Sequence, residues 1–291
     1  MFMKKFVVFV ALLFAGIVLA STGWAQAGKG APVVKIYDIM ACNVYVDFDN
    51  SYVPTKIKRQ QHKFLVAFYP TPGVPTPELI DSITAYGPDG YKIDFAVNQK
   101  HDAKNKNGYI YDPVPDAYWY MVNLDSGFMK EGEYKIEVKC KNGDVVSASR
   151  IQKNAPSDAF VAAYLKNKKI LNSSYSPSQT KKLKPGTPLK DIKVTWTTKE
   201  MASLYAYYIF RLSEGKKISD FDTQKLVWWD NIFRQRLTGR TNAGLEKGEV
   251  IIEAELKPKT SYVYFVEMTD SNIMGDTNIC IFQPHQIFVT P

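Results

Sequence analysis

A predicted hairpin in the middle of the chain constrains the fold most. Between residues 134 and 140, Tyr, Ile, Val and Cys alternate with Lys, Glu and Lys. This period of two is typical of a strand that buries one face. Asn142-Gly143 comes next, and a second strand-like segment follows at 144–149. Both residues of an Asn-Gly pair tolerate the positive φ angles of a tight turn, so the pattern predicts a β-hairpin.

Strand-like segments continue on both sides of this hairpin. Residues 40–48 alternate in the same way, and we expect them to bury one face. The sequence Gly87-Pro88-Asp89-Gly90 predicts a turn between strands at 83–86 and 91–97. The other predicted strands are 64–69, 118–123, 192–196, 204–212, 248–256, 261–268, 278–282 and 286–290. Because strands and helices do not alternate, a dinucleotide-binding fold is excluded and the predicted class is all-β.

The predicted strands fall into two groups, which indicates two tandem β-sandwiches at 33–155 and 189–291. The segment 156–188 between them is rich in Pro, Ser and Lys, and we interpret it as a linker. A short helix is expected at its start, capped by Ser157 or Asp158.

The first 27 residues have the three parts of a secretory signal peptide. Lys4 and Lys5 precede an unbroken apolar or glycine run at 6–20, and the triplet Ala25-Gln26-Ala27 offers a cleavage site. The alternative is an uncleaved anchor, although the run is short for a membrane span. We therefore predict a signal peptide at 1–27, export to the periplasm, cell surface or medium, and no transmembrane segment after cleavage.

The charge of the exported chain limits its partners. The whole chain carries a net charge of +8, and losing Lys4 and Lys5 leaves +6. A basic protein can contact anionic polysaccharide, lipid headgroups or nucleic acid, but export makes nucleic acid an unsuitable partner. The expected partner is a protein or a polysaccharide of the cell envelope. Paired sandwich edges would also allow self-association.

Three cysteines enter an oxidising compartment under this interpretation. Cys42 and Cys140 fall on the apolar phase of their strands, so they could meet across a core as a disulfide. The alternative is two buried free thiols. Cys280 lies between two isoleucines and is expected in the core.

The C-terminal part resembles a fibronectin type III domain. Leu256, Pro258, Thr260 and Tyr262 match that family's Leu-x-Pro-x-Thr-x-Tyr pattern, and Trp196 matches its core tryptophan. The resemblance implies a tyrosine corner, in which the Tyr262 hydroxyl bonds to nearby backbone. Residues 213–248 are longer than the usual connection and put the strand order in doubt. The first half resembles an immunoglobulin-like sandwich more loosely.

Exposed aromatic residues are the best candidates for ligand contact. Trp228 and Trp229 are adjacent, so in a strand one of them must leave the core unless the 213–248 insert covers both. Tyr111 and Trp119 lie in a second aromatic segment with the same two alternatives. Such rings could stack on a sugar or bind a protein partner.

The sequence contains no signature of catalysis. It has no Gly-x-Ser-x-Gly elbow, no phosphate loop and no paired His motif, so we predict no catalytic residue, no cofactor and no metal site. We expect a non-catalytic binding or structural protein. The alternatives are a carbohydrate-binding protein that uses exposed Trp and Tyr, and a polysaccharide-active hydrolase whose site is visible only in the fold.

Overall fold

The computed structural model describes the chain from Val34 onward with several gaps. The described residues are 34–47, 57–102, 105–112, 116–198, 201, 207–222, 225–230, 247–271 and 273–291. The predicted signal peptide at 1–27 lies outside them, as does half of the 213–248 insert.

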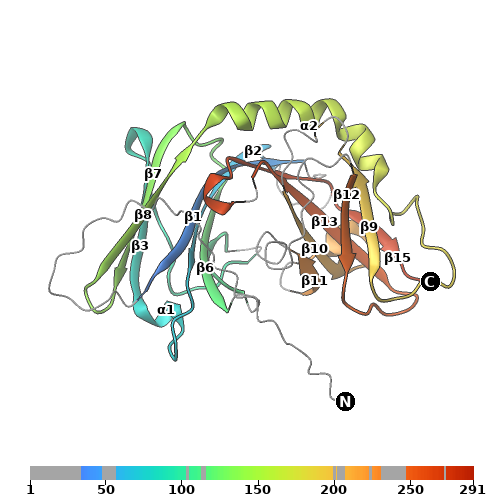
Figure 1. Cartoon of the computed structure of the whole chain (residues 1–291), viewed down its shortest axis with the longest axis horizontal. Coiled ribbons are helices and arrows are strands. Elements are labelled where there is room, and N and C mark those ends of the chain that lie inside the picture. The colour runs from blue at the N-terminus through green and yellow to red at the C-terminus, as the bar shows by residue number, and fades with distance from the viewer. Residues whose placement is uncertain are drawn as a thin grey trace, which may run out of the picture. The chain divides into compact units, whose positions relative to one another are not determined.

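A nine-stranded sheet crosses both halves of the sequence (Figure 1). Its strands are, in spatial order, β11 (Leu226–Asp230), β10 (Tyr207–Glu214), β13 (Ser261–Thr269), β14 (Ile279–Phe282), β1 (Ile36–Val46), β2 (Gln60–Phe68), β6 (Ala117–Leu124) and β5 (Asn107–Asp112), with β15 (Gln286–Val289) paired to β13. At its centre β1 runs parallel to β14, with Asn43 opposite Ile279. Strands from opposite ends of the sequence therefore share one ladder.

Two smaller sheets accompany it. One contains β4 (Lys92–Asp94), β3 (Ile80–Tyr86), β7 (Gly132–Cys140) and β8 (Val145–Gln152), and the other pairs β12 (Lys247–Ile252) with β9 (Ile192–Thr197). The predicted hairpin is β7–β8, and Gly143 has the expected positive φ of 86°. The short helical segments are α1 (Thr76–Leu79), η2 (Pro88–Gly90), η4 (Ile218–Asp220) and η5 (Met274–Asp276).

Both smaller sheets pack on one face of the large sheet, which we call the first face. Around Ile39 and Ala41 of β1 the first face forms a core with β3, β7 and β8, whereas around β10, β13 and β14 it forms a core with β9 and β12. Trp196 of β9 belongs to the second of these cores and lies directly over Gly248, its partner on β12. Any side chain at 248 would collide with the indole, so this close approach requires glycine.

The segment predicted as a linker is mostly helix. α2 (Asn154–Ser174) follows β8 and precedes β9, and is drawn yellow-green in Figure 1. It buries Phe160 and Tyr164 in the core beside β9, while Leu165 is 43% exposed. Burial on the core explains why the helix extends well beyond the short one predicted from its first residues.

Asn43 joins α2 to the sheet. Its side chain is fully buried on the first face of β1. Its amide donates to the Ser157 hydroxyl of α2 at 3.0 Å, and its carbonyl accepts from the backbone N–H of Met129 at 2.7 Å. Both polar ends are therefore satisfied, as burial requires.

The all-β prediction is confirmed, but two tandem sandwiches are not. Contacts group Ala31–Pro291 into one compact unit, and the large sheet continues across the expected boundary. The prediction that residues 40–48 bury only one face is wrong for the described residues, because β1 is buried on both faces. The first face of β1 is covered by β3 and β7, and its second face packs with Met274 of η5 and with side chains of the neighbouring strands.

Candidate functional site

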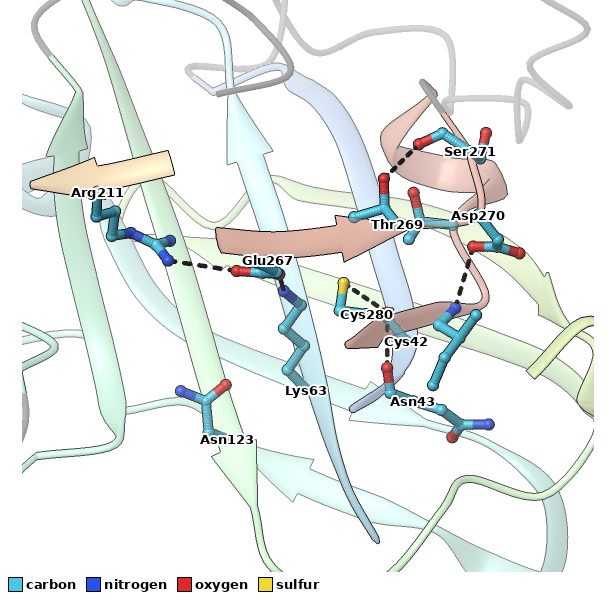
Figure 2. Close-up of polar contacts among 12 residues, drawn as sticks. Cys42, Asn43, Lys63, Asn123, Arg211, Glu267, Thr269, Asp270, Ser271 and Cys280 are labelled. Atoms are coloured by element: carbon cyan, nitrogen blue, oxygen red, sulfur yellow. Dashed lines mark hydrogen bonds and ion pairs between the residues drawn. The ribbon is translucent and has the colours of Figure 1, made fainter. Parts of the chain in front are cut away.

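The second face of the large sheet carries a buried cluster of charges. Met40, Cys42 and Val44 line this face on β1, and Lys63 on β2 stands opposite Cys42. Successive side chains of a strand point to opposite faces. Because Phe64 lies on the first face, its neighbour Lys63 points to the second face. Figure 2 shows Lys63 pointing toward Glu267 of β13.

Glu267 is held by two cations. Lys63 Nζ lies 2.5 Å from Glu267 Oε1, and Arg211 of β10 lies 3.3 Å from Glu267 Oε2 (Figure 2). The side chain of Glu267 is fully buried, that of Lys63 is 6% exposed, and that of Arg211 is 26% exposed. The cluster therefore joins three strands and has one end near solvent.

The charges of this cluster keep one another ionised. Burial alone would raise the pKa of Glu267, but Lys63 and Arg211 outweigh it and hold that pKa below its usual value. Burial alone would lower the pKa of Lys63, yet the neighbouring acidic groups, Cys280 and Glu267 first, raise it above its usual value. A buried charge is tolerated when it is paired and hydrogen-bonded, and this arrangement satisfies that condition.

Two thiols lie beside the cluster. The Sγ atoms of Cys42 and Cys280 are 3.3 Å apart, and both side chains are fully buried. All three cysteines are free, so the disulfide expected between Cys42 and Cys140 does not form in the structure. The physical reason is the sheet: Cys140 belongs to the core between the four-stranded sheet and the first face, while Cys42 points to the second face.

A surface pocket of about 250 Å³ lies beside β5 and β6, at one edge of the large sheet. Its lining residues are Pro70, Thr71, Gly73, Val74, Pro75, Thr76, Tyr111, Asp116 and Tyr118. Tyr111 on β5 stands opposite Tyr118 on β6, so the hairpin register brings the two rings together. Their centroids are 5.1 Å apart and the ring planes are inclined at 46°.

A carboxylate completes this tyrosine pocket. The Tyr111 hydroxyl donates to Asp116 Oδ1 at 2.7 Å, and that hydrogen bond is the main cause of a raised pKa for Tyr111. Tyr111 is 46% exposed. The pocket thus presents two inclined rings and an acceptor on a proline-rich rim.

The structure separates the other predicted aromatic residues. Trp228 is buried in the core on the first face, so it is not an exposed ligand contact. Trp229 is half-buried and points the opposite way, and Trp119 is half-buried against the residues of the second face. Tyr118 belongs to the second aromatic segment, but the sequence did not single it out as a ligand contact. The alternation of β6 could have found it, because Tyr118 and Trp119 must face opposite sides.

The tyrosine-corner residues lie close together. The Tyr262 hydroxyl accepts a hydrogen bond from the backbone N–H of Lys257 at 2.8 Å, and both Tyr262 and Leu256 are buried. The Thr260 hydroxyl donates to the carbonyl of Pro258 at 2.9 Å. These bonds fix the turn into β13, the strand that carries Glu267.

Among the described residues, no group of three or more His, Cys, Asp or Glu side chains could hold a metal ion. Within the same ranges, no helix combines the length and the apolar content needed to cross a membrane.

Comparisons with known proteins give no family. A scan of protein families and a search of curated proteins find no match. Among solved structures the chain is similar to Tp47, the 47-kilodalton lipoprotein of Treponema pallidum, with 10% sequence identity and a TM-score of 0.26. The match covers 90% of this chain and 52% of that one, so this chain spans about half the length of Tp47.

Proposed function

We propose that this protein is an exported, non-catalytic binding protein of the cell envelope or extracellular space, with an immunoglobulin-like N-terminal half and a fibronectin type III-like C-terminal half. Its ligand is a carbohydrate, bound in the tyrosine pocket. The observation that carries the proposal is the pair of inclined rings, the exposed Tyr111 and the half-buried Tyr118, with Asp116 beside them. The N-terminal sequence of residues 1–27 supports export.

The chemistry of the pocket fits a sugar. The apolar face of a pyranose ring packs against an aromatic face, and its hydroxyl groups donate hydrogen bonds to a carboxylate. The rings need little reorganisation on binding, because β5 pairs along its whole length with β6 and this ladder fixes the Tyr111–Tyr118 register. Since Asp116 is acidic, the pocket favours a neutral sugar over an anionic one.

Binding to cell-wall polysaccharides tests the proposal. The mature protein is incubated with insoluble neutral polysaccharides, and oligosaccharides of any that retain it are titrated by calorimetry. Tyr111→Ala should weaken binding at least about tenfold, as loss of an aromatic anchor does at a hot spot. Tyr86→Ala is the matched control, because Tyr86 is 38% exposed on β3 and does not line the pocket. If no neutral polysaccharide binds, or if Tyr111→Ala binds as well as the wild type, the pocket is not a sugar site.

A further inference from the structure

The two thiols on the second face are placed for a covalent link. Cys42 lies on β1 and Cys280 on β14, the two strands that run parallel at the centre of the large sheet. Their sulfur atoms are 3.3 Å apart, a little more than 1 Å beyond the roughly 2.05 Å of a disulfide bond, and the two cysteines are diagonal neighbours, since Cys280 stands opposite Val44. The third thiol, Cys140, has no such neighbour among the cysteines, because it lies in the core between the first face and the four-stranded sheet.

We propose that Cys42 and Cys280 form a disulfide bond in the exported protein and that Cys140 remains a free thiol. The inference rests on the export part of the proposed function and not on sugar binding. It replaces the pairing with Cys140 that the sequence favoured.

The reaction is a two-step thiol–disulfide exchange with a disulfide oxidant. One cysteine thiolate attacks the oxidant, forms a mixed disulfide and releases one oxidant thiol. The second cysteine thiolate then attacks the mixed disulfide, closes the Cys42–Cys280 bond and releases the other oxidant thiol. The two protein thiols lose two protons and two electrons, and the oxidant takes up both electrons and both protons to become two thiols.

Burial of the two thiols limits bond formation to the period before folding is complete. Both thiols are fully buried in the folded chain, so an oxidant reaches them only before the second face closes. In the folded protein, burial raises the pKa of Cys280 well above its usual value, although Lys63 opposes the rise. A thiol is a poor nucleophile until it is deprotonated, so a chain that folds reduced stays reduced.

The bond would hold the central parallel pair together. It closes a loop between residues 238 positions apart. A loop of this size restricts the unfolded chain strongly, so reduction should lower the melting temperature by roughly 10 °C.

Refolding in a glutathione redox buffer tests the inference. After acid quench, the protein is unfolded without reductant, its free thiols are alkylated and counted, and peptides are mapped by mass spectrometry. We expect one free thiol, at Cys140, and a linked pair of peptides containing Cys42 and Cys280. Three free thiols, or a link that includes Cys140, would overturn the inference.

Two variants give a second readout. Cys140→Ala refolded in reductant should melt below the same variant refolded in redox buffer, and this drop should be absent in Cys42→Ala. If the wild type shows no drop, or if Cys42→Ala shows the full drop, the Cys42–Cys280 bond is rejected. The same thiol count on protein recovered from the native cell separates the two proposals. Protein that forms the bond in redox buffer but is found in the native cell without it and with residues 1–27 still attached contradicts export and leaves the pairing intact. Exported protein that lacks the bond overturns the inference.

Discussion

Replacing Lys63 with methionine tests whether the buried cluster stabilises the fold as a unit. Methionine keeps most of the side-chain volume and the contact with Phe282, whose ring centroid lies 5.4 Å from Lys63 Nζ. The change removes the closer of the two cations from Glu267 and leaves Arg211 at 3.3 Å. Breaking a buried ion pair costs about 3–5 kcal/mol. Because Arg211 still compensates part of the charge, we expect a loss of about 3 kcal/mol.

Urea unfolding monitored by tryptophan fluorescence measures this loss. With a slope of about 2–3 kcal/mol per M, the unfolding midpoint should fall by about 1 M. Lys193→Met is the matched control, since Lys193 and Glu249 form an ion pair whose side chains are 54% and 37% exposed. That change should cost less than about 1 kcal/mol.

The double variant Lys63→Met/Glu267→Leu decides between a coupled pair and two independent residues. Removing both charges leaves no uncompensated carboxylate, so it should be less destabilised than Lys63→Met alone. A cost below about 1 kcal/mol for Lys63→Met would refute the reasoning. Strict additivity of the two single changes would refute it as well.

Two further predictions concern the C-terminal strands. Burial lowers the pKa of His285 to about 3, between the rings of Phe221 and Phe265. The unfolded chain binds a proton near pH 6.5, so this residue destabilises the fold progressively as the pH falls below 6.5, by about 2 kcal/mol at pH 5. His285→Phe should flatten that part of a pH–stability curve, and an unchanged slope would contradict the assignment. Tyr262→Phe leaves the Lys257 N–H without its acceptor and should cost about 1 kcal/mol in urea unfolding, whereas Tyr69→Phe at an exposed ring should change stability by less than about 0.5 kcal/mol. Equal effects of the two tyrosine changes would exclude a stabilising corner bond.

Features that depend on neighbouring residues could be predicted from the sequence. The β7–β8 hairpin follows from alternation and one Asn-Gly turn. The bond between Tyr262 and Lys257 joins residues only five positions apart. In both cases the local chemistry decides the conformation, whatever packs above it.

The charged cluster could not be predicted in this way. Lys63 and Glu267 are separated by 204 positions, and no local pattern selects that pair among the many charges of the chain. The same holds for the thiols, because only the pairing of β1 with β14 decides which cysteine Cys42 meets. Burial of both faces of β1 could not be predicted for a related reason. Ala41, Asn43 and Tyr45 suit a face exposed to water as well as a covered one, and only the tertiary fold decides that another layer covers them.

The parallel pairing of β1 with β14 also dictates an order of events during synthesis. β1 emerges early, but Asn43 meets its partner Ile279 only after 236 more residues have been made (279 minus 43). Until then β1 has one open edge, which invites pairing with another chain. Contacts this distant in sequence also slow folding. An incomplete chain that stops before Ile279 therefore cannot close the middle of its main sheet, and it would aggregate or be degraded while the full-length chain matures.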